Sequence, residues 1–251
     1  RNTDNGLLYW RDNPVAPNPA ADKNDATDGD TLIAWALLRA QQQWHEKSYG
    51  SASDAITASL LKSTVVTFAG RQVMLPGAKG FYLNDHLNLN PSYFIFPAWQ
   101  AFAARTHLTA WRKLQSDGQA LLGNMAWGKS QLPSDWVALR ADGKMEPAKE
   151  WPTRMSFDAI RIPLYVYWSD PKSSLLTPWK NWFQCYPRLQ TPAWINVNTD
   201  EVAPWFMTGG LLAVRDLTLG EAQADPQITP QDDYYSASLK LLVWLANKDQ
   251  A

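Results

Sequence analysis

The sequence of 251 residues predicts an all-α protein with a single domain, residues 1–251, and three observations indicate this fold class. Apolar residues recur at intervals of three and four in about eight segments, which is the spacing that buries one face of a helix. No long segment of alternating apolar and polar residues separates them, so a doubly wound α/β sheet is disfavoured. No stretch of low complexity divides the chain.

The first half of the chain begins with an irregular lead-in and a predicted pair of helices. The first helix is expected near 31–47, with Asp28 or Asp30 as its cap, and the second at about 52–66. The stretch 68–90 contains too many glycines and prolines for a helix. We therefore expect a long loop with short strands there.

The remainder of the chain is predicted to form further helices joined by long loops. Pro91 suits the first turn of a helix that runs to about residue 105, and a partner helix is expected at about 109–125. Residues 136–143 have the pattern of a small β-hairpin. The other predicted helices lie at about 156–169, 172–184, 203–216 and 230–248.

Composition excludes several function classes. The chain has 23 Lys and Arg against 24 Asp and Glu and no basic run, which argues against a nucleic-acid partner. No run of about 18 to 20 apolar residues could span a membrane. A single cysteine, Cys185, excludes sites built on several thiolates, and none of the three histidines has a metal-ligand neighbour at suitable spacing. We expect no metal and no cofactor.

The 14 tryptophans are an unusual excess, and their positions divide them into two groups. Those within helical stripes are expected in the core: Trp35, Trp44, Trp99, Trp111, Trp168 and Trp244. Those in loops are candidates for flat platforms that bind a ligand: Trp10, Trp127, Trp136, Trp151 and Trp194.

Carboxylates and aromatic rings are the remaining groups that could carry chemistry, and together they suit hydrolysis of glycosidic bonds. Asp28 and Asp30 flank one glycine directly before a predicted helix, so they serve either as helix caps or as ligand-binding groups. Asp158 and Arg161 share a helix face, which indicates either a structural ion pair or a general base held by its arginine. Tyr93 either packs in the core or projects its hydroxyl into a cleft.

Longer motifs resemble the family 8 glycoside hydrolases. The signature-like segment is Ala26-Thr27-Asp28-Gly29-Asp30, followed by Ile33-Ala34, Ala36-Leu37-Leu38, Ala40 and Trp44. Further segments follow in the family's order: Asn90-Pro91-Ser92-Tyr93, Pro133-Ser134-Asp135-Trp136, Ser156-Phe157-Asp158-Ala159-Ile160-Arg161 and Asp233-Tyr234-Tyr235. The chain is similar in particular to the endoglucanases encoded with bacterial cellulose-synthesis machinery.

The resemblance implies an (α/α)6 barrel, a periplasmic or secreted location, and inverting endo-hydrolysis of β-1,4-glucan or cello-oligosaccharides. It assigns catalytic roles to Asp158, as the general base, and to Asp28, as a carboxylate that positions the sugar. It implies substrate contacts for Trp10, Tyr93, Arg161 and one of Tyr234 and Tyr235. Xylan, mixed-linkage glucan and non-catalytic glucan binding remain alternatives.

One departure from the family concerns the general acid. The family places this glutamate in a Glu-Gly-x-Ser-Tyr-Gly-Met type segment upstream of the Asp28 motif, and no such segment occurs here. The glutamates are Glu46, Glu146, Glu150, Glu201 and Glu221. The chain has about eight predicted helices where the family has twelve, which also indicates that the first helices are missing. We therefore expect a barrel that lacks its N-terminal portion, with reduced activity, completed by another copy or by an N-terminal fragment.

Overall fold

The structure, a computed structural model, describes residues 4–15, 17 and 22–251. The chain forms two compact units, one comprising residues 1–118 and 138–144 and the other residues 119–137 and 145–251. Eight α-helices and seven short strands occur within the described residues. The predicted helical character is therefore confirmed, and the single-domain organisation stays a prediction.

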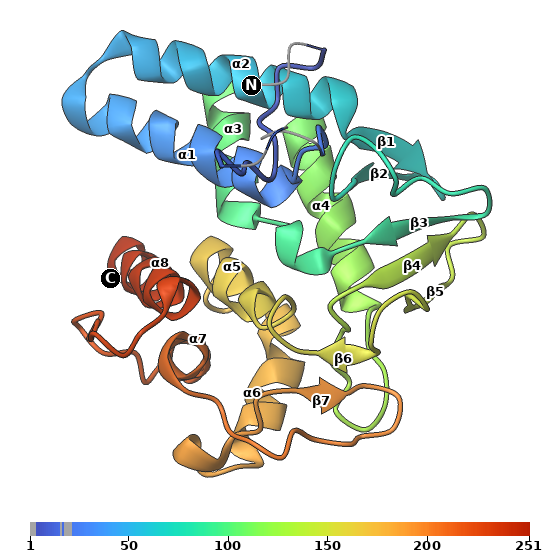
Figure 1. Cartoon of the computed structure of the whole chain (residues 1–251), viewed down its shortest axis with the longest axis vertical. Coiled ribbons are helices and arrows are strands. Elements are labelled where there is room, and N and C mark those ends of the chain that lie inside the picture. The colour runs from blue at the N-terminus through green and yellow to red at the C-terminus, as the bar shows by residue number, and fades with distance from the viewer. Residues whose placement is uncertain (1–3, 16, 18–21) are drawn as a thin grey trace. The chain divides into compact units, whose positions relative to one another are not determined.

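In the first unit, the first two helices, α1 (Thr27–Trp44) and α2 (Lys47–Ser63), pack side by side (Figure 1). Its other helices are the short 3₁₀ helix η1 (Pro91–Tyr93), α3 (Phe96–Thr106) and α4 (Thr109–Gly123), whose last turn belongs to the second unit. Its strands are β1 (Val65–Phe68), β2 (Arg71–Met74), β3 (His86–Leu89) and β4 (Val137–Arg140). β1 and β2 form an antiparallel pair. β2 and β3 lie in the stretch 68–90 where short strands were expected, whereas β1 begins at residue 65, within the predicted helix.

The start of α1 differs from the prediction that an aspartate caps it. The N-cap is Ala26, whose side chain makes no capping bond, and both aspartates lie in the first helical turn. The helix begins early because Thr27 is anchored, its N–H donating to Pro76 O (2.9 Å) and its hydroxyl to Leu75 O (2.9 Å). Both carboxylates still lie at the positive end of the helix dipole.

Two other helix starts also differ from the predictions. α2 begins at Lys47 because the Glu46 carboxylate caps it by accepting the Ser48 N–H, so the expected start at residue 52 is wrong. The helix expected from Pro91 begins only at Phe96. Asn90 caps a 3₁₀ turn first, and Pro97 then suits the first turn of α3.

The second unit contains three helices in mutual contact, with α7 and α8 packed together and both touching α5 (Figure 1). Its helices are α5 (Arg161–Ser169), η2 (Ser174–Leu176), α6 (Thr177–Gln184), η3 (Arg188–Gln190), α7 (Gly209–Leu219) and α8 (Tyr234–Asp249). Its strands are β5 (Met145–Pro147), β6 (Arg154–Met155) and β7 (Ile195–Asn196). β6 and β7 are antiparallel, with Arg154 opposite Asn196.

The helices of the second unit are shorter than predicted at their N-terminal ends. α5 starts five residues late because residues 156–160 form a turn that an aspartate holds, as described below. α8 starts at Tyr234 because Asp233 caps it by accepting the Ser236 N–H (2.7 Å). The predicted hairpin at 136–143 is present as β4 and a turn, in which Arg140 N–H donates to Lys144 O.

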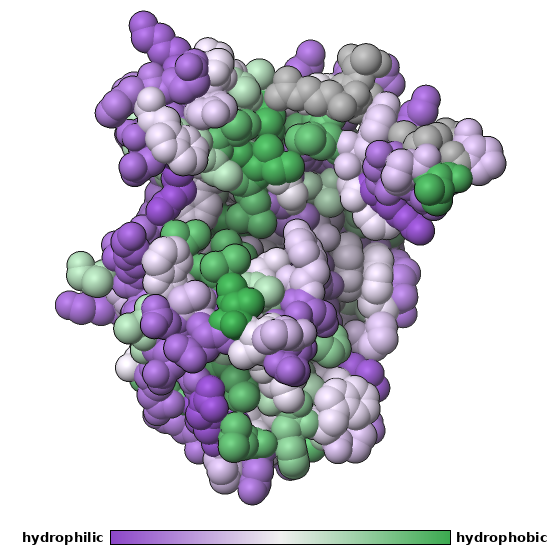
Figure 2. Space-filling model, turned by 60° about the vertical axis from the view of Figure 1, so that its left-hand side comes forward, coloured by the Kyte–Doolittle hydropathy of each residue, from purple (hydrophilic) through white to green (hydrophobic). Residues whose placement is uncertain are grey.

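The helical tryptophans mostly lie in the cores. Trp99 and Trp111 are fully buried, and Trp35 and Trp168 are nearly so. The expectation fails for Trp44, which is 68% exposed at the end of α1, and Trp244 is only partly buried. The face shown in Figure 2 carries both hydrophobic and hydrophilic residues.

Among the described residues, no helix combines the length and the apolar character needed to cross a membrane.

Candidate active site

The turn between β6 and α5 presents Asp158. Ile160 N–H donates to Ser156 O (3.1 Å), and Arg161 N–H donates to Asp158 O (3.0 Å). These bonds fold residues 156–160 into a tight turn that leads directly into α5. Asp158 therefore lies before the helix, not on it as the sequence spacing suggested.

Asp158 and Arg161 form the ion pair that their spacing indicated. Asp158 Oδ1 lies 2.8 Å from Arg161 Nη2, and the arginine side chain is 14% exposed against 36% for the aspartate. A mostly buried guanidinium thus fixes a carboxylate that stays accessible. This arrangement suits a carboxylate that must remain ionised and in place.

Asp135, which lies in the loop before β4, holds this turn through its side chain. Its Oδ1 accepts the backbone N–H groups of Ser156 (2.9 Å) and Ala159 (2.7 Å), and its Oδ2 accepts the Ser156 hydroxyl. Burial, helped by the negative charge of Asp158, raises the pKa of Asp135 to about 6 although the three hydrogen bonds lower it. The Asp135 carboxyl group thus makes its hydrogen bonds to residues of this turn.

Tyr235 also contacts the turn, from the first turn of α8. Its hydroxyl donates a hydrogen bond to Phe157 O. Burial raises the pKa of Tyr235, and the Arg161 charge opposes that rise. Tyr234 instead points into solvent, with 89% of its surface exposed. Of the two predicted tyrosines, Tyr235 is therefore the one beside Asp158.

A cleft of about 260 Å³ lies beside this turn and includes both aspartates in its lining. Trp136 and Trp151 stack face to face in it, with ring centroids 4.2 Å apart and planes 9° from parallel. On another wall, Arg154 lies 3.6 Å from the centre of the Trp194 ring, which packs edge-on against Trp205. Flat aromatic faces beside carboxylates suit a ligand with apolar faces and polar edges.

The first unit contains the other carboxylate candidates. Asp28 lies half-buried in the first turn of α1, and a Cβ added to Gly29 would meet nothing within 4 Å, so the space beside it is open. Asp30 is buried, and its Oδ1 accepts the Leu8 N–H (2.9 Å). Burial, with a contribution from the charges of Asp25 and Asp28, raises the pKa of Asp30 to about 7, although the hydrogen bond from Leu8 lowers it. Asp30 is therefore a structural acid, whereas Asp28 is accessible.

The two aromatic candidates of the first unit have different exposures. Trp10 is 52% exposed, and its indole N–H donates to Asp22 (2.7 Å). Tyr93 ends η1 and is half-buried. The structure therefore brings Asp158, Arg161 and Tyr235 together in the second unit, while Asp28, Trp10 and Tyr93 lie in the first.

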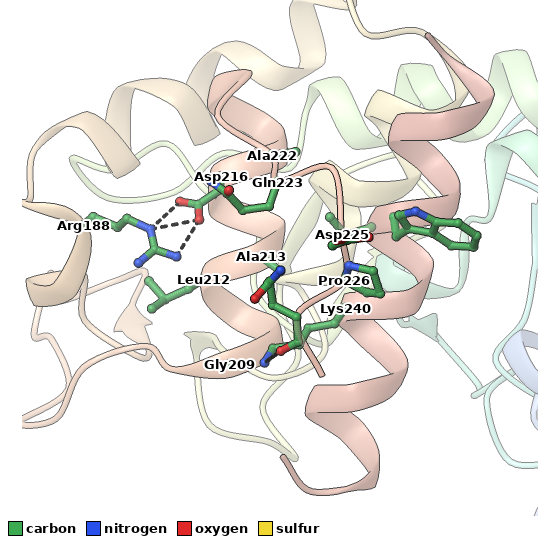
Figure 3. A pocket seen from close by; sticks show the side chains of 13 residues that line it. Arg188, Gly209, Leu212, Ala213, Asp216, Ala222, Gln223, Asp225, Pro226 and Lys240 are labelled. Atoms are coloured by element: carbon green, nitrogen blue, oxygen red, sulfur yellow. Dashed lines mark hydrogen bonds and ion pairs between the residues drawn. The ribbon is translucent and has the colours of Figure 1, made fainter. Parts of the chain in front are cut away.

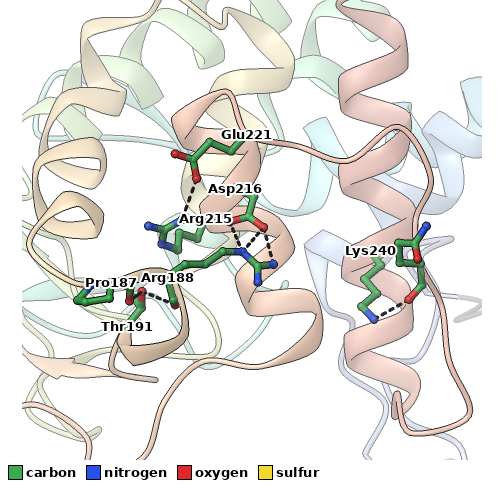
Figure 4. A network of polar contacts seen from close by, with 8 residues as sticks. Pro187, Arg188, Thr191, Arg215, Asp216, Glu221 and Lys240 are labelled. Atoms are coloured by element: carbon green, nitrogen blue, oxygen red, sulfur yellow. Dashed lines mark hydrogen bonds and ion pairs between the residues drawn. The ribbon is translucent and has the colours of Figure 1, made fainter.

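A second cavity, of about 210 Å³, lies between α7, α8 and the loop after α7 (Figure 3). Two of its cations are paired: Arg188 donates to both oxygens of Asp216, and Lys240 pairs with the neighbouring Asp232 at 2.7 Å. Arg215 joins Asp216 to Glu221 in the same network (Figure 4). This network is a structural feature of the α7–α8 pair.

The residues of the cleft that were not among the predicted site residues include Asp135, Arg154 and Trp205. Asp135 belongs to the Pro-Ser-Asp-Trp segment that carried the resemblance, so its motif was the available signal. Arg154 and Trp205 have no local pattern, since strand pairing and loop packing place them. Among the described residues, no group of three or more His, Cys, Asp or Glu side chains could hold a metal ion.

Comparison with known proteins gives consistent matches. The sequence model described as glycosyl hydrolases family 8 matches residues 1–249. An endoglucanase of Cellulomonas uda is 82% identical over 221 residues, which cover 88% of this chain and 62% of that protein. The chain thus spans less than two thirds of that relative's length.

Two crystal structures are similar throughout. An endo-β-1,4-glucanase from an Achatina fulica gut metagenomic library is 85% identical with a TM-score of 0.97, and the match covers 99% of this chain and 79% of that one. The endoglucanase Cel10 of Klebsiella pneumoniae is 80% identical with a TM-score of 0.98, and the match covers 100% and 81%. These matches confirm the expected fold class, the (α/α)6 barrel of these hydrolases.

Proposed function

Because the chain belongs to glycosyl hydrolase family 8, we propose that it is an endo-β-1,4-glucanase, which cleaves internal bonds of β-1,4-glucan with inversion. The observation that carries the proposal is the accessible, arginine-paired carboxylate of Asp158 at the edge of a tryptophan-lined cleft. Cellulose-like chains have apolar ring faces and hydroxyl-bearing edges, which match aromatic walls and charged groups.

In the proposed reaction Asp158 is the general base. It takes a proton from a water molecule as that water attacks the anomeric carbon, and Arg161 keeps the carboxylate in place. Tryptophan faces hold the sugar rings of the glucan, and Asp28 binds the sugar at the bond that breaks. The C–O bond to the leaving sugar breaks as the bond to water forms, so the product anomer is inverted.

We assign the role of proton donor for the leaving oxygen to none of the glutamates in this sequence. Glu46 caps α2 and Glu221 pairs with Arg215, so both have structural contacts. We propose that another copy or an N-terminal fragment completes the barrel, and that a glutamate outside these residues protonates the leaving oxygen. A positioned donor contributes about 10²- to 10⁴-fold in rate, so this chain alone is expected to be slow on natural glucan.

A substrate comparison tests the function. Soluble carboxymethylcellulose should lose viscosity well before many reducing ends appear, since endo-cleavage shortens chains rapidly, while xylan and mixed-linkage glucan serve as competitors. An aryl cellotrioside with a dinitrophenolate leaving group needs no protonation, and it should be hydrolysed by the chain alone. Tight binding of cello-oligosaccharides without hydrolysis of either substrate would instead support a glucan-binding protein.

A glucanase of this kind acts on a polymer outside the cytoplasm. We therefore propose a periplasmic or secreted location, and cell fractionation with activity staining would test it.

A further inference from the structure

We propose that Asp135 is a positioning residue for the reaction: it holds the turn of residues 156–159 and thereby sets the place of the Asp158 carboxylate. This inference rests on the proposed function, in which Asp158 is the base. It adds a residue for which no role was predicted.

The hydrogen bonds of Asp135 reach both ends of the turn. Ser156 lies two residues before Asp158 and Ala159 one residue after it, and one carboxylate oxygen accepts the backbone N–H of both. The other oxygen accepts the Ser156 hydroxyl. The Asp135 carboxylate thus spans the segment that carries Asp158.

The backbone reinforces the same connection. Asp135 N–H donates to Arg154 O at 2.7 Å, so the residue is tied to the strand that enters the turn. Arg154 belongs to β6, and the pairing of β6 with β7 fixes the position of the carbonyl that Asp135 contacts. Displacement of Asp135 would therefore move the turn against β6.

The charges around the turn explain why an ionised carboxylate is needed there. Two backbone N–H groups and one hydroxyl all donate towards Asp135, so a neutral carboxyl or amide could not accept all three bonds equally well. The charges of Asp158 and Arg161 pair with each other at 2.8 Å, and Arg154 lies over the Trp194 ring. Misplacement of a reacting group by about 1 Å can cost about 10²-fold in rate.

The test compares Asp135→Asn with Asp158→Ala on the dinitrophenyl cellotrioside. For Asp135→Asn we expect kcat to fall on the order of 10²-fold while KM and the binding of cellotriose stay within about threefold. Amide hydrogen exchange should accelerate at residues 156–160 and remain unchanged in α7 and α8. Ser156→Ala removes one of the three bonds and should give a smaller fall in kcat.

Azide separates positioning from proton transfer. In Asp158→Ala, azide can attack the anomeric carbon directly, since the C–N bond forms and dinitrophenolate leaves without any proton transfer. Azide should therefore restore turnover of Asp158→Ala and leave the Asp135→Asn defect largely uncorrected. Equal rescue of both variants would show that Asp135 takes the proton itself and would overturn the proposal.

A matched control and two further outcomes complete the test. Asp117→Asn removes another carboxylate that accepts a backbone N–H, from Gln72 at 2.7 Å, and it should leave kcat unchanged. Unchanged exchange at 156–160, or faster exchange throughout the second unit, would overturn the positioning role. Failure of the unmodified protein to hydrolyse the aryl glycoside would contradict the proposed function alone, because exchange still reports whether Asp135 holds the turn.

Discussion

Arg161 and Asp158 lie three residues apart on opposite sides of the start of α5, and their side chains meet at 2.8 Å. The pairing depends on the turn before the helix, because Asp158 lies in that turn and Arg161 is the first residue of α5. The turn therefore converts a common helical spacing into a fixed, accessible carboxylate.

The first prediction concerns Arg161. Arg161→Lys keeps the positive charge and loses the planar guanidinium, so it should lower kcat on the aryl cellotrioside about tenfold while cellotriose binding changes little. Arg161→Gln should lower kcat further. Steady-state kinetics of the two variants measures this, and equal activity of Arg161→Gln and the unmodified protein would remove the arginine from the mechanism.

The second prediction concerns the stacked tryptophans of the cleft. Trp136→Ala should weaken cello-oligosaccharide binding about tenfold, because a flat aromatic face in such a site contributes about 1 kcal/mol or more. Trp44→Ala removes an exposed tryptophan of the first unit and serves as the control. Titration by isothermal calorimetry compares them, and equal loss in both variants would contradict the role of the cleft.

Much of the fold could be predicted from the sequence because helical periodicity is local. Eight segments were expected to be helical, and eight α-helices occur in the described residues, but most starts moved by four to six residues. Two of those shifts have long-range causes, whereas α2 and α8 start where the neighbouring side chains of Glu46 and Asp233 cap them. Thr27 is anchored by residues 75 and 76, and Asp135 holds residues 156–159, and neither contact leaves a local pattern.

The site was predicted unevenly for the same reason. Asp158 and Arg161 are neighbours in sequence, so spacing alone indicated their ion pair. The contact of Tyr235 with Phe157 spans 78 residues and depends on the packing of α8 against α5, so sequence reasoning could not choose between Tyr234 and Tyr235. The roles of Asp28, Trp10 and Tyr93 stay predictions.

The third prediction concerns the buried charge network of α7. Asp216 pairs with Arg188 and Arg215, and Asp216→Asn would remove a buried counter-charge from both guanidinium groups, of which Arg215 would keep only Glu221. We expect the free energy of unfolding to fall by about 3 to 5 kcal/mol. Asp142→Asn alters an exposed carboxylate that contacts Lys144 and should lower the free energy of unfolding far less. Urea denaturation of both variants measures the difference, and similar losses would contradict a structural role for the network.

The fourth prediction concerns pH. The pKa of Asp30 is about 7 in the folded protein against an ordinary value of 3.8, so between these values the folded state binds more protons than the unfolded state. This contribution to stability is fully present below about pH 4 and is lost as the pH rises through 7. Asp30→Asn should therefore flatten the fall in Tm between pH 4 and 7.

The matched control for this prediction is Asp142→Asn, because the backbone N–H of Lys144 holds the pKa of that exposed carboxyl below its ordinary value. Its titration lies outside the pH window, so the variant should keep the slope of the unmodified protein. Parallel profiles of Tm against pH for Asp30→Asn and the unmodified protein would contradict the raised pKa of Asp30.

The most direct test of the account compares Asp158→Asn with the unmodified protein on the dinitrophenyl cellotrioside, with proton NMR to identify the first product anomer. The account predicts that the unmodified protein releases the inverted α-anomer, and that Asp158→Asn loses at least about 10²-fold in kcat while it binds cellotriose equally well. Retained turnover in Asp158→Asn, or release of the β-anomer first, would contradict it.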